Sequence, residues 1–252
     1  MEATSAAGID ADQPRHVAEM DVAFCESLLQ SEEDVGLPET VGLLEHVFWE
    51  PDDSLTFREL LSAEDIIRDR TVLEIGTGSG LVSLCCLHGG ARFVVATDIN
   101  PWAYRNAILN AQRHNVAERL SVRLVPPRKP GAWTVIKPTE RFDVIYSNPP
   151  WQPGKPTHVE DYAFYDPGFQ LMTSLLDGAP QHLNPGGRLL LSYGCCEAIV
   201  KLQQEATRRG YTCRIHDDRD LTTLPNLFLP GMLIEVVMET PETKTARRSG
   251  RQ

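Results

Sequence analysis

The sequence predicts an α/β fold in which helices cover both faces of a mostly parallel sheet of seven strands with an antiparallel final strand. Three observations support this class. From Thr71 onward, short apolar runs alternate with loops and amphipathic segments in the order strand, loop, helix, which is typical of a parallel sheet. A glycine-rich loop at residues 76–80 directly follows the first apolar run, and two further runs near the C-terminus suit a closing antiparallel pair.

The individual elements follow in chain order. Strands are expected at residues 71–75, 91–97, 120–125, 142–147, 188–192, 211–216 and 233–238. Helices are expected at residues 81–87, and from Pro101 to about 114 because Asn100 can cap a helix that has proline at its first position. A further helix should start at Asp166-Pro167, and the last should run over residues 197–209 and end at Gly210. The segment Asn184-Pro185-Gly186-Gly187 is expected to form a turn.

The regions outside this core are expected to form three segments. Residues 1–13 are small and polar and are expected to be disordered, and residues 241–252 form a basic tail that follows the catalytic domain at 71–240. Residues 14–70 are expected to form a helical lid, with a packing extension remote from the chemistry as the alternative. The lid is predicted from the helical spacing of Val17, Met20, Phe24 and Leu28, an extended stretch at 47–49, and a cap at Asp52-Asp53-Ser54 before a helix with Phe57, Leu60 and Leu61.

Composition and charge narrow the class of protein. The chain has 252 residues and a net charge of −11, of which residues 1–54 carry −13 and residues 55–252 carry +2. A strongly basic surface for nucleic acid is therefore missing, and such a substrate is disfavoured. The sequence contains neither an apolar run long enough to span a membrane nor a signal peptide, so we expect a cytoplasmic protein. The cysteines and histidines lack metal-ligand spacing, and no metal is expected.

The glycine loop and the acid after the second strand predict a nucleoside site. Gly76, Gly78 and Gly80 allow a tight turn and a close approach of ligand to backbone. Their spacing differs from the GxGxxG of dinucleotide sites, and the carboxylate of Glu74 would repel a pyrophosphate but attract the ammonium group of a sulfonium amino acid. Asp98, at the end of the second strand, is placed to accept both ribose hydroxyls.

A stiff corner after the fourth strand predicts what is done with that nucleoside. The corner is Asn148-Pro149-Pro150-Trp151, in which two prolines fix the backbone and remove donors. The Asn148 side-chain oxygen and the Pro149 carbonyl can together hold both hydrogens of a planar amide or amine, while the Trp151 ring covers its face. We expect the nitrogen held in this way to be methylated by S-adenosyl-L-methionine, with S-adenosyl-L-homocysteine as product.

These stretches together resemble the class I S-adenosylmethionine-dependent methyltransferases, and most closely the HemK/PrmC-type glutamine N-methyltransferases. The resemblance covers about residues 47–200 and implies a Rossmann-like sheet. It is carried by Val72–Gly80, Thr97–Pro101 and Phe142–Trp151, with a weaker match at Phe48–Ser54. It implies that Glu74, Gly76 and Gly78 contact the methionine part of the cofactor, that Asp98 binds the ribose and that Ile99 contacts the adenine face. Thr77 and Gly80 are expected among the cofactor-binding residues, and Asn148 and Pro149 are expected to bind the acceptor nitrogen.

The sequence departs from those enzymes in ways that leave the acceptor open. Trp151 stands where they usually have tyrosine, and Val125-Pro126-Pro127 offers no acid or amide to the adenine amino group. The preferred acceptor is an amide or amine of a protein or peptide; an exocyclic base amine of RNA or DNA, a small metabolite, and a non-catalytic cofactor-binding subunit are the alternatives. His158 and Tyr162, with Glu160 and Asp161, are candidate helpers for proton release from the loop that follows. The oligomeric state is left open.

Overall fold

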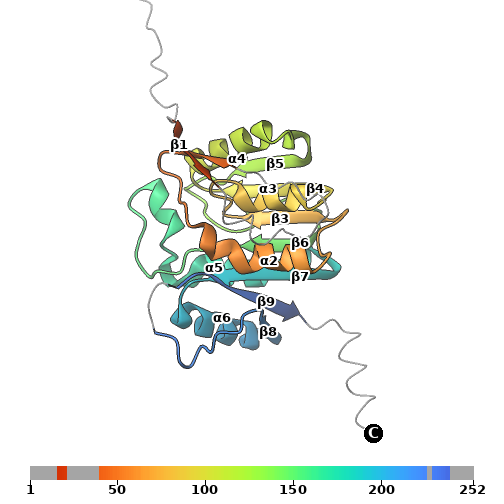
Figure 1. Ribbon diagram of the computed structural model, residues 1–252. Coiled ribbons are helices and arrows are strands. Elements are labelled where there is room, and N and C mark those ends of the chain that lie inside the picture. The colour runs from red at the N-terminus through yellow and green to blue at the C-terminus, as the bar shows by residue number, and fades with distance from the viewer. Residues whose placement is uncertain (1–15, 22–39, 226–228, 239–252) are drawn as a thin grey trace, which may run out of the picture.

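The computed structural model describes residues 16–21, 40–225 and 229–238, and its centre is a sheet of seven strands (Figure 1). The strand order is β5-β4-β3-β6-β7-β9-β8. These strands are β3 Thr71–Ile75, β4 Phe93–Asp98, β5 Leu120–Leu124, β6 Phe142–Ser147, β7 Leu183–Tyr193, β8 Tyr211–Ile215 and β9 Met232–Met238. Neighbours from β5 to β7 pair in parallel, whereas β9 pairs antiparallel with both β7 and β8. The predicted fold class is confirmed.

Helices lie on both faces of the sheet because side chains along each central strand alternate between two apolar cores. On β3, Val72 belongs to one core and Leu73 to the other. The first core also contains residues of α2 and α3, and the second contains residues of α5 and α6. Strands that are buried on both faces read as continuous apolar runs, which is why the sequence revealed them. The helices are α2 Leu55–Ala63, α3 Leu81–His88, α4 Pro101–Arg113, α5 Gln170–His182 and α6 Cys196–Arg208.

The predicted N-terminal helix is wrong for the part of it that the structure describes. Residues His16–Asp21 form strand β1, which pairs antiparallel with β2, Thr40–Leu44. Val17 and Met20 lie in this strand, while Phe24 and Leu28 fall outside the described residues. The hairpin is decided by pairing between segments some twenty residues apart, a contact that helical spacing within one segment does not reveal. In the described part of residues 14–70, helical structure is confined to α2 and the short helix before it.

The second strand of this hairpin is bound to α4 by side chains. Asn106 Oδ1 accepts from Leu44 N at 2.7 Å, and Asn110 Oδ1 accepts from Gly42 N at 2.9 Å. Both side-chain nitrogens donate to Gly42 O and also to Ser79 O in the glycine loop, at 2.8 to 3.1 Å. Two buried asparagines one helical turn apart therefore join the N-terminal segment to the glycine loop.

Several local details differ from the sequence expectations. Pro51–Ser54 form a short 3-10 helix, η1, and residues 47–50 before it belong to no helix or strand, which is compatible with the expected extended stretch. Ser54 does occupy the N-cap position of α2, but its hydroxyl donates to Pro51 O and caps no helix nitrogen. The expected turn at residues 184–187 is a bulge within β7, because Phe142 pairs with Leu183 while Val144 already pairs with Arg188. The irregularity leaves the sheet intact, and the strand begins earlier than predicted.

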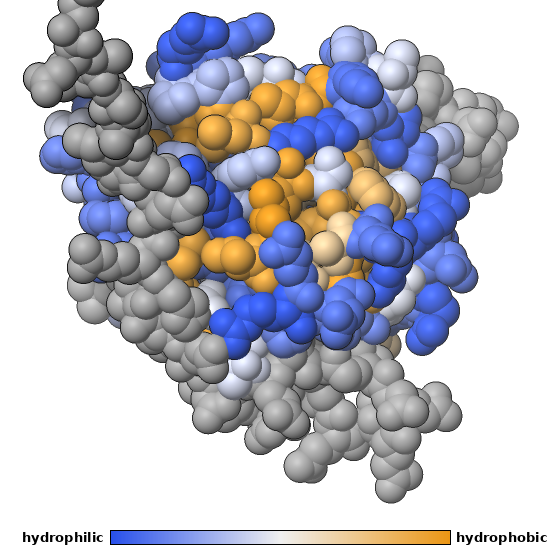
Figure 2. All heavy atoms as spheres, turned by 90° about the horizontal axis from the view of Figure 1, so that it is seen from above, coloured by the Kyte–Doolittle hydropathy of each residue, from blue (hydrophilic) through white to orange (hydrophobic). Residues whose placement is uncertain are grey.

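The remaining observations concern the surface, the cysteines, possible membrane spans and the predicted terminal segments. Figure 2 looks down on the side where α4 and β5 lie in Figure 1, and apolar side chains gather there between hydrophilic ones. Leu109 on α4 and Leu124 on β5 are exposed. Cys85, Cys86 and Cys195 are buried, as the sequence suggested. Within the described residues, no helix is long and apolar enough to cross a membrane. The expected disordered and basic ends at 1–13 and 241–252 lie outside the described residues, and the domain borders stay predictions.

Candidate active site

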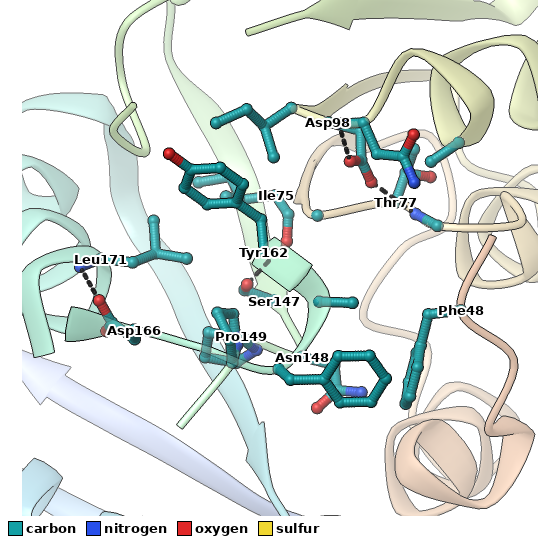
Figure 3. Close-up of a pocket in the computed structure, with 18 of the residues that line it drawn as sticks. Phe48, Ile75, Thr77, Asp98, Ser147, Asn148, Pro149, Tyr162, Asp166 and Leu171 are labelled. Atoms are coloured by element: carbon teal, nitrogen blue, oxygen red, sulfur yellow. Dashed lines mark hydrogen bonds between the residues drawn. The ribbon is translucent and has the colours of Figure 1, made fainter. Parts of the chain in front are cut away.

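A cavity of about 340 Å³ lies at the carboxyl ends of β3, β4 and β6. This is where the strand order reverses, since β4 lies on one side of β3 and β6 on the other. Open α/β sheets bind their ligands at such a point. In Figure 3, Asp98 and Thr77 lie on one side of the cavity, and Asn148 and Pro149 lie on the other. The two motifs that the sequence singled out thus share one cavity.

The glycine loop contributes the wall beneath Asp98, and its glycines serve different purposes. Gly76, Thr77 and Gly78 line the cavity. At Gly76, where φ is +78°, no atom lies within 4 Å of an added Cβ, so the backbone is open to a ligand. At Gly80, where φ is +86°, a Cβ would lie 2.9 Å from the Cα of Ala107 on α4. Gly80 does not line the cavity, and its lack of a Cβ permits close packing of the loop against α4.

Glu74 is a buried carboxyl beneath the loop. Only 3% of its surface is exposed, and its Oε2 accepts hydrogen bonds from Thr77 Oγ1 at 2.8 Å and from Ser83 Oγ. Burial raises the pKa of Glu74 to about 7, with the Ser83 and Thr77 hydroxyls opposing that shift and the charge of Asp98 adding to it. The carboxyl still lines the cavity, and it gains negative charge near neutral pH.

Asp98 ends β4 and faces the same wall. Its Oδ2 accepts from Gly78 N at 2.9 Å and its Oδ1 accepts from Asn100 N at 2.8 Å. Each carboxylate oxygen has a second lone pair, so both retain capacity to accept a hydroxyl hydrogen. Burial raises the pKa of Asp98, while the backbone donors oppose the shift. Ile99, Val125, Pro130 and Gly131 continue the cavity wall beyond Asp98 and make it apolar.

The corner after β6 forms the opposite wall. Asn148, Pro149, Pro150 and Trp151 all line the cavity. The strand before them is fixed because Ser147 Oγ donates to Ile75 O at 2.7 Å and Tyr146 is buried, with its ring stacked on Phe57 at 4.1 Å. Trp151 packs against the core cluster on the α5 and α6 face of the sheet. The corner is held rigidly from both of its sides.

Asp53 is a site residue that sequence reasoning missed. It lies in η1, is 6% exposed, and lines the cavity. Asn148 Nδ2 donates to its Oδ2 at 3.4 Å. The Asp52-Asp53-Ser54 run was interpreted as a helix cap, which is the common use of such residues. Apart from that run, only the weak family match at residues 48–54 pointed to Asp53 in the sequence. Its hydrogen-bond partner, Asn148, lies 95 positions away, so the contact cannot be read from the local sequence.

Two segments meet on the outer side of the cavity. Phe48, from the N-terminal segment, packs edge to face with Phe164 from the loop after the corner, with ring centroids 5.3 Å apart. His46 lies 3.5 Å from Glu160 across the same junction. Phe48, Phe164 and Glu160 line the cavity, as do Trp49 and Glu50. Residues 48–51, 53 and 54 therefore line one part of the cavity, and residues 156, 159, 160 and 162–167 line another.

The fold separates the four proton-release candidates, since Glu160 and Tyr162 line the cavity and His158 and Asp161 do not. Tyr162 lines the cavity, and Figure 3 shows it between Asp98 and Asp166. His158 lies outside the cavity lining, with 74% of its side chain exposed, and it is 3.8 Å from Asp161. Asp161 accepts from the backbone nitrogens of Thr157 and His158, so its carboxylate orders the loop. The structure therefore brings Tyr162, but not His158, to the site.

The residues present fit the cofactor that the sequence suggested. Open backbone at Gly76 and an acceptor carboxylate at Asp98 suit an amino acid and a ribose, respectively. The apolar wall from Ile99 to Gly131 suits a flat base. A cavity of about 340 Å³ is within the range for small-molecule sites, roughly 300–1,000 Å³.

Comparison with solved structures gives the class of this fold. The chain resembles a ribosomal protein L11 methylase from Lactobacillus delbrueckii subsp. bulgaricus, with a TM-score of 0.55, 17% identity, and coverage of 77% of this chain and 82% of that one. It also resembles the T. Thermophilus 16S rRNA N2 methyltransferase in complex with AdoMet and Guanosine, with a TM-score of 0.58, 18% identity, and coverage of 90% and 51%. The chain therefore shares the fold of these two methyltransferases.

Sequence comparison names the nearer relatives. Residues 57–149 match the family model described as Ribosomal protein L11 methyltransferase (PrmA). The chain is 33% identical over 183 residues to a release factor glutamine methyltransferase of Cereibacter sphaeroides, covering 67% of this chain and 57% of the relative. The chain thus spans little more than half the length of that relative. The resemblance to glutamine N-methyltransferases that the motifs predicted is confirmed.

Proposed function

We propose that the chain is an S-adenosylmethionine-dependent N-methyltransferase that modifies an amide nitrogen in a protein or peptide. The observation that supports this best is the shared cavity, with Asp98 and the glycine loop on one side and Asn148 and Pro149 on the other. The relatives named as glutamine methyltransferases favour an amide as the acceptor. The proposed acceptor is the side-chain amide of glutamine, which is the residue that the names of those relatives give.

The chain's own residues account for the activation of a poor nucleophile. The lone pair of an amide nitrogen is delocalised, so the nitrogen attacks slowly unless positive charge on it is stabilised. Asn148 Oδ1 and Pro149 O, as two acceptors on a rigid corner, would each take one hydrogen of the NH2 group and stabilise that charge as it develops. Orientation of the nitrogen at the corner supplies a further part of the rate.

The remaining residues of the cavity wall would bind the cofactor and exclude water. When bound, S-adenosylmethionine supplies an electrophilic methyl group. Gly76, Gly78 and Glu74 would hold its amino acid part, and Asp98 its ribose, as the open loop and the paired carboxylate oxygens allow. The aromatic pair Phe48 and Phe164 lines the cavity and would limit the access of water to it once the ligands are bound, which would strengthen the hydrogen bonds made at the corner. Tyr162 and Glu160, which also line the cavity, are the proton-release candidates that remain.

A flat base amine is the second candidate acceptor. Trp151, Phe48 and Phe164 all line the cavity and would stack on an unpaired base. The charge distribution opposes this choice, since residues 55–252 carry only +2 and residues 1–54 carry −13. The protein acceptor therefore ranks first.

The test is a methyl-transfer assay with labelled S-adenosylmethionine and cell lysate, divided into protease-treated and nuclease-treated portions. We expect the labelled product to be lost with protease and retained with nuclease. Mass spectrometry of model peptides should then show one added methyl group on a glutamine peptide and none on the matched glutamate peptide. Label that survives protease and disappears with nuclease would instead establish the base amine.

A further inference from the structure

The amide of Asn148 must face the acceptor with the correct end. Its oxygen accepts hydrogens and its nitrogen donates them, yet the two ends are nearly identical in shape. If the amide were inverted, its NH2 group would oppose the NH2 group of the acceptor and repel it. The proposed function therefore requires some neighbour that fixes which end of Asn148 faces the cavity.

The side chain of Asp53 is the neighbour in contact with that amide. Asn148 Nδ2 lies 3.4 Å from Asp53 Oδ2, and the Asp53 residue is 6% exposed. An ionised carboxylate only accepts hydrogen bonds, so it binds the nitrogen end of the amide and repels the oxygen end. The nitrogen end then faces η1, and the oxygen end faces away from Asp53.

Asp53 is itself held in place from a second direction. The backbone of Gly231, just before β9, donates a hydrogen bond to its carboxylate. The two backbones approach so closely that a Cβ on Gly231 would lie 2.2 Å from Asp53 O. The carboxylate is thus positioned by η1 and by the segment before β9, and it does not depend on Asn148 for its place.

We propose that Asp53 is a positioning residue that fixes the orientation of the Asn148 amide, so that Oδ1 faces the acceptor nitrogen. This inference rests on the proposed function for its consequence, but the contact itself can be tested without turnover. The carboxylate also polarises the amide and makes Oδ1 a better acceptor. The site thereby uses a negative charge that never touches the acceptor.

The protonation state of Asp53 controls this effect. Burial raises the pKa of Asp53 to about 6, the hydrogen bonds from Asn148 and Gly231 oppose the shift, and the charges of Glu50 and Asp52 add to it. Asp53 also interacts electrostatically with Tyr146 of β6, and the charges of Glu74 on β3 and Arg58 on α2 act on the same tyrosine. A protonated Asp53 can donate to Asn148 Oδ1 and so permits the inverted amide.

The kinetic test compares Asp53→Asn with a matched control, Asp52→Asn. Asp52 is adjacent and acidic but lies outside the cavity lining. Hydrogen bonds to charged groups contribute about 1.5–3 kcal/mol, so Asp53→Asn should lower kcat by roughly tenfold or more. Its affinity for S-adenosylmethionine, measured by calorimetry, should stay within about twofold. Asp52→Asn should keep the wild-type kcat, and a merely structural role for Asp53 would reduce kcat and affinity together.

The pH profile and a spectroscopic measurement complete the test. Wild-type kcat should fall as the pH drops below about 6, and Asp53→Asn should lack that acid limb. In NMR spectra, the side-chain NH2 signals of Asn148, assigned by their loss in Asn148→Ala, should shift between about pH 5 and 8 in the wild type but not in Asp53→Asn.

The outcomes separate this inference from the proposed function. Wild-type protein that transfers no methyl group to any lysate component would refute the proposed function. The NMR titration would still test the contact between Asp53 and the Asn148 amide. The role of Asp53 would be overturned if the NMR signals of the Asn148 NH2 group did not change with pH. It would also be overturned if Asp53→Asn kept the wild-type kcat and the fall of kcat at acid pH.

Discussion

The buried carboxyl of Glu74 makes the stability of this protein depend on pH, and Glu74→Gln should remove that dependence. The substitution keeps the size of the side chain and an oxygen that can accept from Thr77 and Ser83. It removes the ability to ionise. Because the group is only 3% exposed, water gives its charge little compensation.

The magnitude follows from the two pKa values. Burial raises the pKa of Glu74 from 4.5 to about 7 in the folded protein. This difference of about 2.5 corresponds to about 3 kcal/mol, at about 1.36 kcal/mol for each pKa unit. Below pH 4.5, Glu74 is protonated in both the folded and the unfolded protein, so its burial does not lower the free energy of unfolding through ionisation. Between there and pH 7 the unfolded chain binds fewer protons than the folded one, so the free energy of unfolding falls as the pH rises.

Urea unfolding of wild type and variant across this window measures the effect. The difference in unfolding free energy, Glu74→Gln minus wild type, should rise with pH by up to about 3 kcal/mol. Glu118→Gln, at an exposed carboxylate, is the control and should follow the wild type at every pH. A difference for Glu74→Gln that stays constant from acid to neutral pH would refute the reasoning.

Three further substitutions test the other parts of the site. Asn148→Ala should reduce kcat by about 10²-fold or more, because it removes an acceptor used as charge develops, while calorimetry shows little change in cofactor affinity. Asp98→Ala should weaken S-adenosylmethionine binding by about tenfold or more in the same calorimetric assay, because it removes the carboxylate placed for the ribose. Asn110→Ala should lower the free energy of unfolding by about 2 kcal/mol, because it leaves the buried Gly42 N without its acceptor.

For each of these three substitutions, one result would contradict the expected effect. Equal losses of turnover and cofactor affinity in Asn148→Ala would mean that the corner shapes the whole cavity and does not act on the acceptor alone. Unchanged binding in Asp98→Ala would remove the ribose assignment. Wild-type stability in Asn110→Ala would show that Asn106 alone joins the hairpin to the glycine loop, since it donates to the same two carbonyls.

Local sequence was sufficient for the core because its signals arise within single segments. The strand ending at Ser147 was predicted to the residue, since its apolar run is bounded by a proline corner that cannot continue a strand. The start of α4 was predicted because Asn100 caps it, with its side chain accepting from Trp102 N at 2.9 Å. The N-terminal hairpin was missed because each of its strands is defined by the other and by Asn106 and Asn110.

The sequence by itself determined the sheet, the glycine loop and the proline corner, because backbone restriction and side-chain periodicity act between near neighbours. Only the tertiary structure decided which carboxylates serve the site. It placed Asp53 beside Asn148, which is 95 positions away, and it left His158 at the surface while bringing Tyr162 inward. Such contacts depend on how η1, β9 and the loop after β6 pack around one cavity, and no single segment of the chain contains that information.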